Sequence, residues 1–141
     1  MIENEEFTDL VEKKLAFLKT DYGCKLNYPR KGFVRFLSDD FTLTVAYGRN
    51  SLEVSLAPGE KHWSRVTRNK SLSIVTIVEN LDKNQSLDEN TNIRTLEDLA
   101  DDLDRYEYLL QKYCANILNG DISVWNEVVK SWQGSSRYFG H

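Results

Sequence analysis

The stretch FTLTVAYGRNSLEVSLAPG, residues 41–59, decides the fold of this chain. Apolar side chains alternate there with small or polar ones in two runs, residues 41–47 and 52–57. Because successive side chains of a strand point to opposite faces of a sheet, each run predicts a strand with one apolar face. The link between the runs, residues 48–51, consists of turn-forming residues, and so short a link favours an antiparallel hairpin.

The segments on either side of this hairpin extend it into a larger sheet. Residues 33–37 predict another strand, because only the turn-forming residues 38–40 separate them from the hairpin. Residues 71–81 are ambiguous: their β-branched residues favour a strand, whereas apolar residues three positions apart favour a helix. We therefore expect an antiparallel meander of three or four strands.

Helices are predicted before and after the sheet region. In residues 4–20 and 95–119, apolar residues recur three or four positions apart, which is the spacing of one helix face. Thr95 followed by Asp98 resembles a capping box, and Gly120 is placed as the C-terminal stop of the second helix. Both helices therefore have an apolar side that can pack on the sheet.

A third, shorter helix is expected from Asp121 or Ser123 to Trp132, with its tryptophans as packing residues. The chain is then an α+β protein with an N-terminal helix, an antiparallel meander of three or four strands, and C-terminal helices packed on one face of the sheet. We expect a single domain over residues 1–133 and a flexible tail over residues 134–141.

The composition is that of an ordinary globular chain. Of 141 residues, 40% are hydrophobic and 28% charged, which excludes a wholly disordered protein. No apolar run approaches the roughly 18 residues needed to cross a bilayer, and residues 1–6 are acidic, unlike a secretory signal. We expect a cytoplasmic protein that does not bind membranes. Cys24 and Cys114 lack the spacing of a zinc site or a disulfide framework, which favours free buried thiols.

The residues that carry catalytic chemistry are isolated. His62 is the only internal histidine, and we interpret it as a solvated loop residue, with hydrolysis through His62 as the least favoured hypothesis. The seven glycines are scattered singly, which excludes the common phosphate-binding loops. We therefore expect no enzymatic activity, no cofactor and no metal ion.

Carboxylates cluster on the long predicted helix. If Leu99 faces the core, a step of about 100° per residue divides the cluster into an outward face and two flanks. The residues expected on the outward face are Glu97, Asp101, Asp104 and Tyr108. Asp98 and Asp102 are expected on the flanks, and Asp101 is expected to pair with Arg105. We call the four outward residues the acidic face, and we favour a solvated surface there over a magnesium site.

The acidic face has the character of a protein-binding surface. An exposed tyrosine surrounded by carboxylates resembles a binding hot spot, although a plain solvated face is the alternative interpretation. Residues 71–141 carry 12 Asp and Glu against 6 Lys and Arg, whereas residues 1–70 carry 10 against 12. Such an acidic half attracts a basic partner through long-range electrostatics. The sequence leaves the partner's identity and the oligomeric state open.

The basic loop, residues 61–70, is the alternative functional surface. It carries Trp63, Arg65 and Arg68, which are suited to stacking on a base and holding phosphates. Only one aromatic residue is present, and the whole chain has a formal charge of −4, so nucleic-acid binding is the less favoured hypothesis. In the competing interpretation, Trp63 simply covers an edge of the sheet.

Several short strings resemble those of a loose set of small bacterial α+β proteins of unknown function, some of which are suspected toxin-immunity proteins. The strings are Leu103-Asp104-Arg105-Tyr106, Leu109-Leu110, Ile117-Leu118-Asn119-Gly120-Asp121 and Val124-Trp125, with Tyr22-Gly23-Cys24 in place of a "YGF"-like string. The resemblance implies a helix rather than a strand over residues 71–81, and it implies no catalytic residues. We therefore expect a non-enzymatic, intracellular protein-interaction module, with an immunity protein that occludes a toxin as its specific form.

Overall fold

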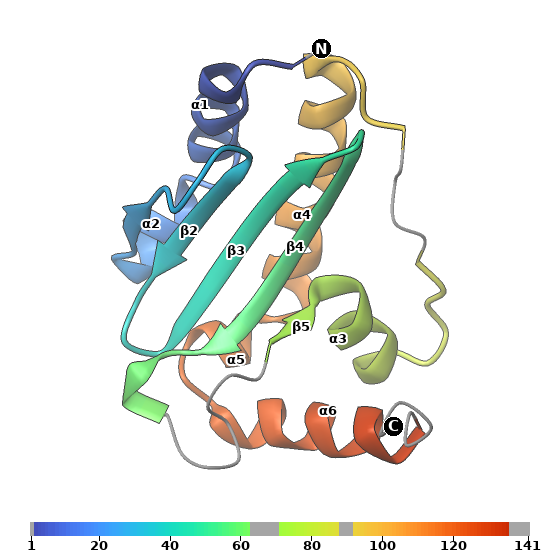
Figure 1. Ribbon diagram of the computed structural model, residues 1–141. Coiled ribbons are helices and arrows are strands. Elements are labelled where there is room, and N and C mark those ends of the chain that lie inside the picture. Colours follow the sequence, from blue (N-terminus) through green and yellow to red (C-terminus); the bar gives the residue numbers. More distant parts are fainter. Residues whose placement is uncertain (1, 63–70, 88–91, 136–141) are drawn as a thin grey trace.

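The centre of the computed structural model, which describes residues 2–62, 71–87 and 92–135, is a five-stranded antiparallel sheet (Figure 1). The strands follow the chain in the order β1-β2-β3-β4-β5, so the sheet is a simple meander. They are β1 (Lys25–Asn27), β2 (Phe33–Leu37), β3 (Phe41–Gly48), β4 (Ser51–Pro58) and β5 (Leu72–Ser73). The predicted meander is confirmed, and its two short edge strands bring the number of strands to five.

The register of β3 and β4 gives the sheet one apolar face. Leu43 lies opposite Leu56, and Val45 lies opposite Val54, and all four side chains are fully buried. The hairpin turns at Arg49 and the residue after it, which have φ values of 53° and 62°. Positive φ at both central positions is the geometry of a type I′ turn, whose twist matches that of the flanking strands.

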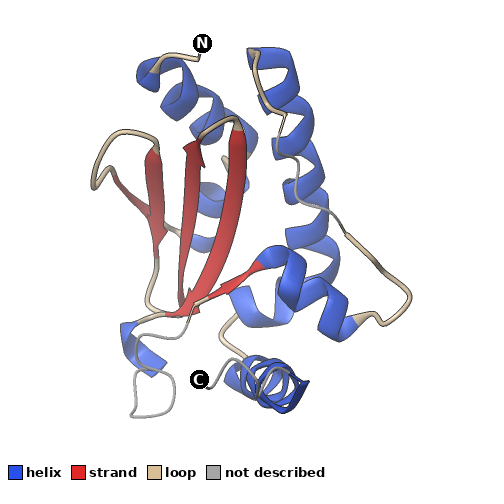
Figure 2. Cartoon of the chain, turned by 45° about the vertical axis from the view of Figure 1, so that its right-hand side comes forward, coloured by secondary structure: helices blue, strands red, loops and turns tan. Residues whose placement is uncertain are grey.

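The helices pack on that apolar face. They are α1 (Asn4–Lys14), α2 (Phe17–Tyr22), α3 (Ile74–Leu81), α4 (Leu96–Tyr113), α5 (Ala115–Leu118) and α6 (Ile122–Ser135), with a 3₁₀ turn η1 (Glu60–His62) after β4. Figures 1 and 2 show α1, α2 and α4 on the same side of the sheet, and α6 beyond its lower end. The opposite side of the sheet carries no helix within the described residues.

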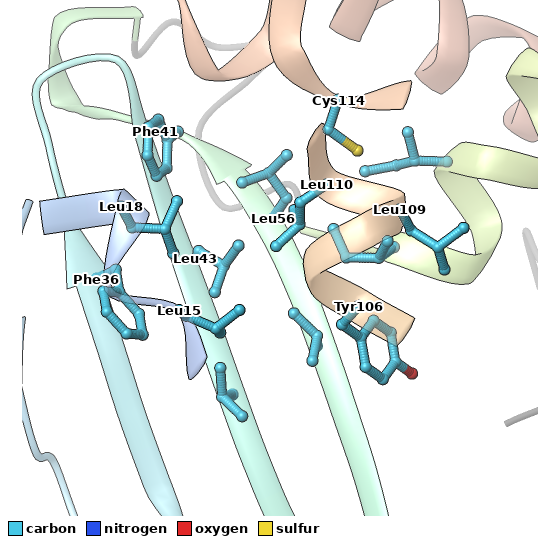
Figure 3. Close-up of a cluster of buried hydrophobic side chains, with 14 of the residues drawn as sticks. Leu15, Leu18, Phe36, Phe41, Leu43, Leu56, Tyr106, Leu109, Leu110 and Cys114 are labelled. Carbon is cyan, nitrogen blue, oxygen red and sulfur yellow. The ribbon is translucent and has the colours of Figure 1, made fainter. Parts of the chain in front are cut away.

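One hydrophobic core joins the sheet to the helices (Figure 3). Leu15 and Leu18 approach from the α1–α2 region, and Tyr106 and Leu110 approach from α4. Trp125 of α6 is also fully buried, which confirms its interpretation as a packing residue. Full burial of each leucine in this core contributes about 1.5–3 kcal/mol.

The predicted helices are present with changed boundaries. The helix expected over residues 4–20 is divided into α1 and α2, and the helix expected over residues 95–119 is divided into α4 and α5. Residues 71–81 contain both of the expected structures, because the two-residue strand β5 leads directly into α3, with Ser73 as its N-cap. Helix α6 extends to Ser135, two residues beyond the predicted end of the domain at residue 133.

Local signals in the sequence proved reliable. The Thr95 side chain accepts a hydrogen bond from the backbone N–H of Asp98, and the Asp98 side chain accepts one from the backbone N–H of Thr95, which is the predicted capping box.

Cys24 and Cys114 are both free and buried, and burial raises their pKa values to about 11 and about 12. Among the described residues, no helix is both long and apolar enough to cross a membrane.

We predict that Gly59→Ala destabilises the fold and that Gly48→Ala, at the other end of the same hairpin, does not. A Cβ atom at Gly59 would overlap the backbone carbonyl oxygen of Asp39, whereas a Cβ atom at Gly48 would meet nothing within 4 Å. Overpacking of this kind costs about 1–3 kcal/mol. Urea unfolding of both variants measures the difference, and equal stability of the two would contradict the close approach at Gly59.

Candidate functional site

The acidic face lies on the solvent side of α4. Glu97, Asp101 and Asp104 are exposed, and Tyr108 is 56% exposed, as the 100° step per residue predicts. The opposite side of α4 carries Leu99, Leu103 and Tyr106, which are buried in the core. The sequence therefore located this surface correctly, although its binding role remains a prediction.

The charges on the acidic face are only partly neutralised. Lys14 of α1 pairs with Asp104 at 2.9 Å, and both side chains are partly exposed. Lys112 donates a hydrogen bond to the Tyr108 hydroxyl oxygen at 3.0 Å, and this contact raises the pKa of Lys112. Glu97 and Asp101 form no ion pair with any described residue, so their carboxylates are available to a partner.

A groove runs between α1 and α4 beside the acidic face. It has a volume of about 440 Å³ and includes Glu97 in its lining. The remaining lining residues are Glu6, Asp9, Leu10, Lys13, Leu96 and Ala100. We call this set of seven residues the α1–α4 groove. Leu10, Leu96 and Ala100 are its apolar residues, and the other four lining residues are three acidic ones and one lysine.

The expected pairing of Asp101 with Arg105 is wrong. Arg105 Nε donates instead to Asp102 Oδ1 at 3.0 Å, and the Asp102 side chain is only 4% exposed. Asp102 was expected on a solvated flank of α4, but the packing of α4 in the fold covers this flank. An i,i+3 pair that is largely buried replaces the solvent-exposed i,i+4 pair.

Burial raises the pKa of Asp102, because the low-dielectric surroundings penalise its charged form, and the nearby Arg105 guanidinium partly offsets this effect. Asp102 Oδ2 is buried and accepts no hydrogen bond from any described residue. An ionised carboxylate in such a place destabilises the fold unless its partner compensates. Arg105 is the partner that offsets part of this cost.

His62 is not the solvated loop residue that the sequence predicted. It ends the 3₁₀ turn η1, its side chain is only 16% exposed, and its Nε2 lies 2.9 Å from Asp40 Oδ1. Lys61 Nζ lies 3.7 Å from the same oxygen. Asp40 thus connects the turn after β4 to the turn between β2 and β3. Trp63, Arg65 and Arg68 lie outside the described residues, so nucleic-acid binding by the basic loop stays a prediction.

A second hollow, of about 620 Å³, lies between the start of α1 and the β3–β4 turn. Its charged lining residues, Glu3, Lys31 and Arg49, are all exposed, so it lacks the buried polar group of a built ligand site. Among the described residues there is also no group of three His, Cys, Asp or Glu side chains that is placed to hold a metal ion. The α1–α4 groove and the acidic face are therefore the strongest candidate site.

Comparisons with protein-family models, with curated proteins and with solved structures found no match. The case for a function therefore rests on the geometry and charges of the chain itself.

Sequence reasoning found the acidic face and missed the groove. Asp9 and Lys13 are four positions apart on α1 and Leu10 lies between them, but nothing in this pattern says that α4 packs beside it. The nearest signal was Leu96 at the first position of α4, which continues the apolar stripe three positions before Leu99 but stays 39% exposed.

We predict that the pKa of Asp102 lies above its ordinary value of 3.8 and rises further in Arg105→Gln, because that variant loses the compensating charge. The raised pKa means that the native protein binds the proton more tightly than the unfolded chain. As pH rises from the ordinary Asp102 pKa of 3.8 to the raised pKa of the folded protein, wild type therefore loses stability relative to Asp102→Asn. Carboxyl ¹³C NMR titration and urea unfolding at a series of pH values measure both effects. A pKa below 3.8 would contradict the burial argument.

Proposed function

We propose that this protein is a non-enzymatic protein-interaction module whose acidic face binds a basic protein partner. The observation that carries the proposal is the row of exposed side chains along α4, two of whose carboxylates form no ion pair with a described residue. A charged row on a rigid helix is preorganised, so little conformational entropy is lost when a partner binds. The exposed Tyr108 adds a rigid aromatic contact beside the charges.

Electrostatics support a basic partner. The chain has a net charge of −4, and the half that contains α4 supplies the acidic excess. Opposite charge on a partner accelerates diffusional encounter and disfavours acidic competitors. The specific role of a toxin-immunity protein fits this chemistry, because such a protein works by covering a basic active-site cleft with an acidic surface.

We predict that the double variant Asp101→Lys/Asp104→Lys weakens binding of the partner about tenfold or more, because it replaces two attractive contacts with repulsive ones. The fold should survive, since both residues are exposed and the Lys14–Asp104 pair is worth about 0–1 kcal/mol. Capture from an extract of the source cells, followed by carbodiimide cross-linking and mass spectrometry, identifies the partner and the carboxylates that it contacts.

The matched control is Glu53→Lys/Glu127→Lys, which makes the same change in net charge on β4 and α6. Both control residues are exposed. The proposal requires the control to bind normally and the captured protein to be basic. Equal binding by both double variants, or cross-links that avoid α4, would show that the acidic face is not the binding surface.

A further inference from the structure

We propose that the α1–α4 groove receives a basic amphipathic helix of the partner, with an apolar side chain of that helix inserted against Leu10, Leu96 and Ala100. This inference rests on the proposed function and specifies the chemistry of the segment that binds. The acidic face attracts the partner by charge, whereas the groove provides an apolar anchor point beside it.

The apolar part of the groove is open to solvent. Leu96 is 39% exposed although it begins a helix that is packed against the rest of the fold, and Leu10 is only partly buried. A lone exposed leucine is ordinary, but here it faces the same hollow as Leu10 and Ala100. Covering this surface would remove apolar area from water at about 25 cal/mol per Å².

Carboxylates stand on both helices that form the groove. Glu6 and Asp9 belong to α1, and Glu97 belongs to α4, so an occupant meets negative charge on either side of the apolar surface. Lys13 is the single cation among the lining residues. The complementary segment is therefore one with apolar residues in a row and Lys or Arg on both flanks.

A helix meets this requirement better than a strand does. Residues three and four positions apart form an apolar row along a helix, and the positions beside them flank the row on both sides. A strand instead sends alternate side chains to opposite faces, so it cannot place cations on both flanks of one apolar row as closely. Docking of an amphipathic helix into a groove is a general mode of recognition.

The test uses three synthetic probes of equal length: a Leu/Lys peptide with leucines at helical spacing, a peptide of the same composition with strict alternation, and oligolysine. Fluorescence anisotropy measures their affinities, and ¹⁵N NMR maps the amides that shift. We expect the helical probe to bind most tightly and to shift the amides of Leu10, Leu96 and Ala100. Leu96→Ala should weaken its binding about tenfold.

The matched control is Leu81→Ala, because Leu81 of α3 is also 39% exposed and lies away from the groove. Normal binding by Leu81→Ala together with weak binding by Leu96→Ala supports the groove. Equal binding of the helical and alternating peptides overturns the choice of a helix, and absence of binding by the helical probe overturns the inference as a whole.

Two further outcomes separate the groove from its rivals. If Leu96→Ala binds the captured partner normally while Asp101→Lys/Asp104→Lys does not, the groove inference fails and the proposed function stands. If both variants bind the partner normally, the groove inference and the proposed function both fail. If groove amides shift with protein concentration in the absence of peptide, a second copy of the chain occupies the groove, and the inference is wrong.

Discussion

The alternation of side chains along β3 and β4 is the constraint on which the rest of the structure depends. Because the register pairs Leu43 with Leu56 and Val45 with Val54, all of the large apolar side chains of the hairpin lie on one face. The helices must then cover that face, and α1 and α4 lie side by side on it. The groove between them, and the outward side of α4, are consequences of this one-sided packing.

The parts of the fold that sequence could predict are those set by near neighbours. The hairpin depends on alternation and a short turn, and the start of α4 depends on a capping box between Thr95 and Asp98, so both were readable locally. Asp102 and His62 were misjudged because their surroundings depend on the tertiary fold: Asp102 is buried where α4 packs, and His62 contacts Asp40, which lies 22 residues earlier. The groove was missed for the same reason, since its two walls are about 90 residues apart in sequence.

The same packing that hides Asp102 exposes Asp101 and Asp104, so neighbouring carboxylates on one helix take opposite roles. Asp102 is buried and pairs with Arg105, whereas Asp101 and Asp104 are exposed; Asp104 pairs with Lys14, and Asp101 forms no ion pair with a described residue. Helical geometry thus places the Asp102 carboxylate inside the fold and directs the Asp101 and Asp104 carboxylates toward solvent. A partner would contact only the exposed carboxylates, together with the apolar residues of the α1–α4 groove beside them.

Hydrogen–deuterium exchange on the protein with its captured partner tests most directly whether binding uses α1 and α4. We predict added protection in residues 4–14 and 96–113, with the strands β2, β3 and β4 unchanged, because the open face of the sheet is not the contact surface. Protection confined to residues 33–58, or to the segment that follows η1, with none in the two helices, would contradict the assignment of the binding surface to α1 and α4.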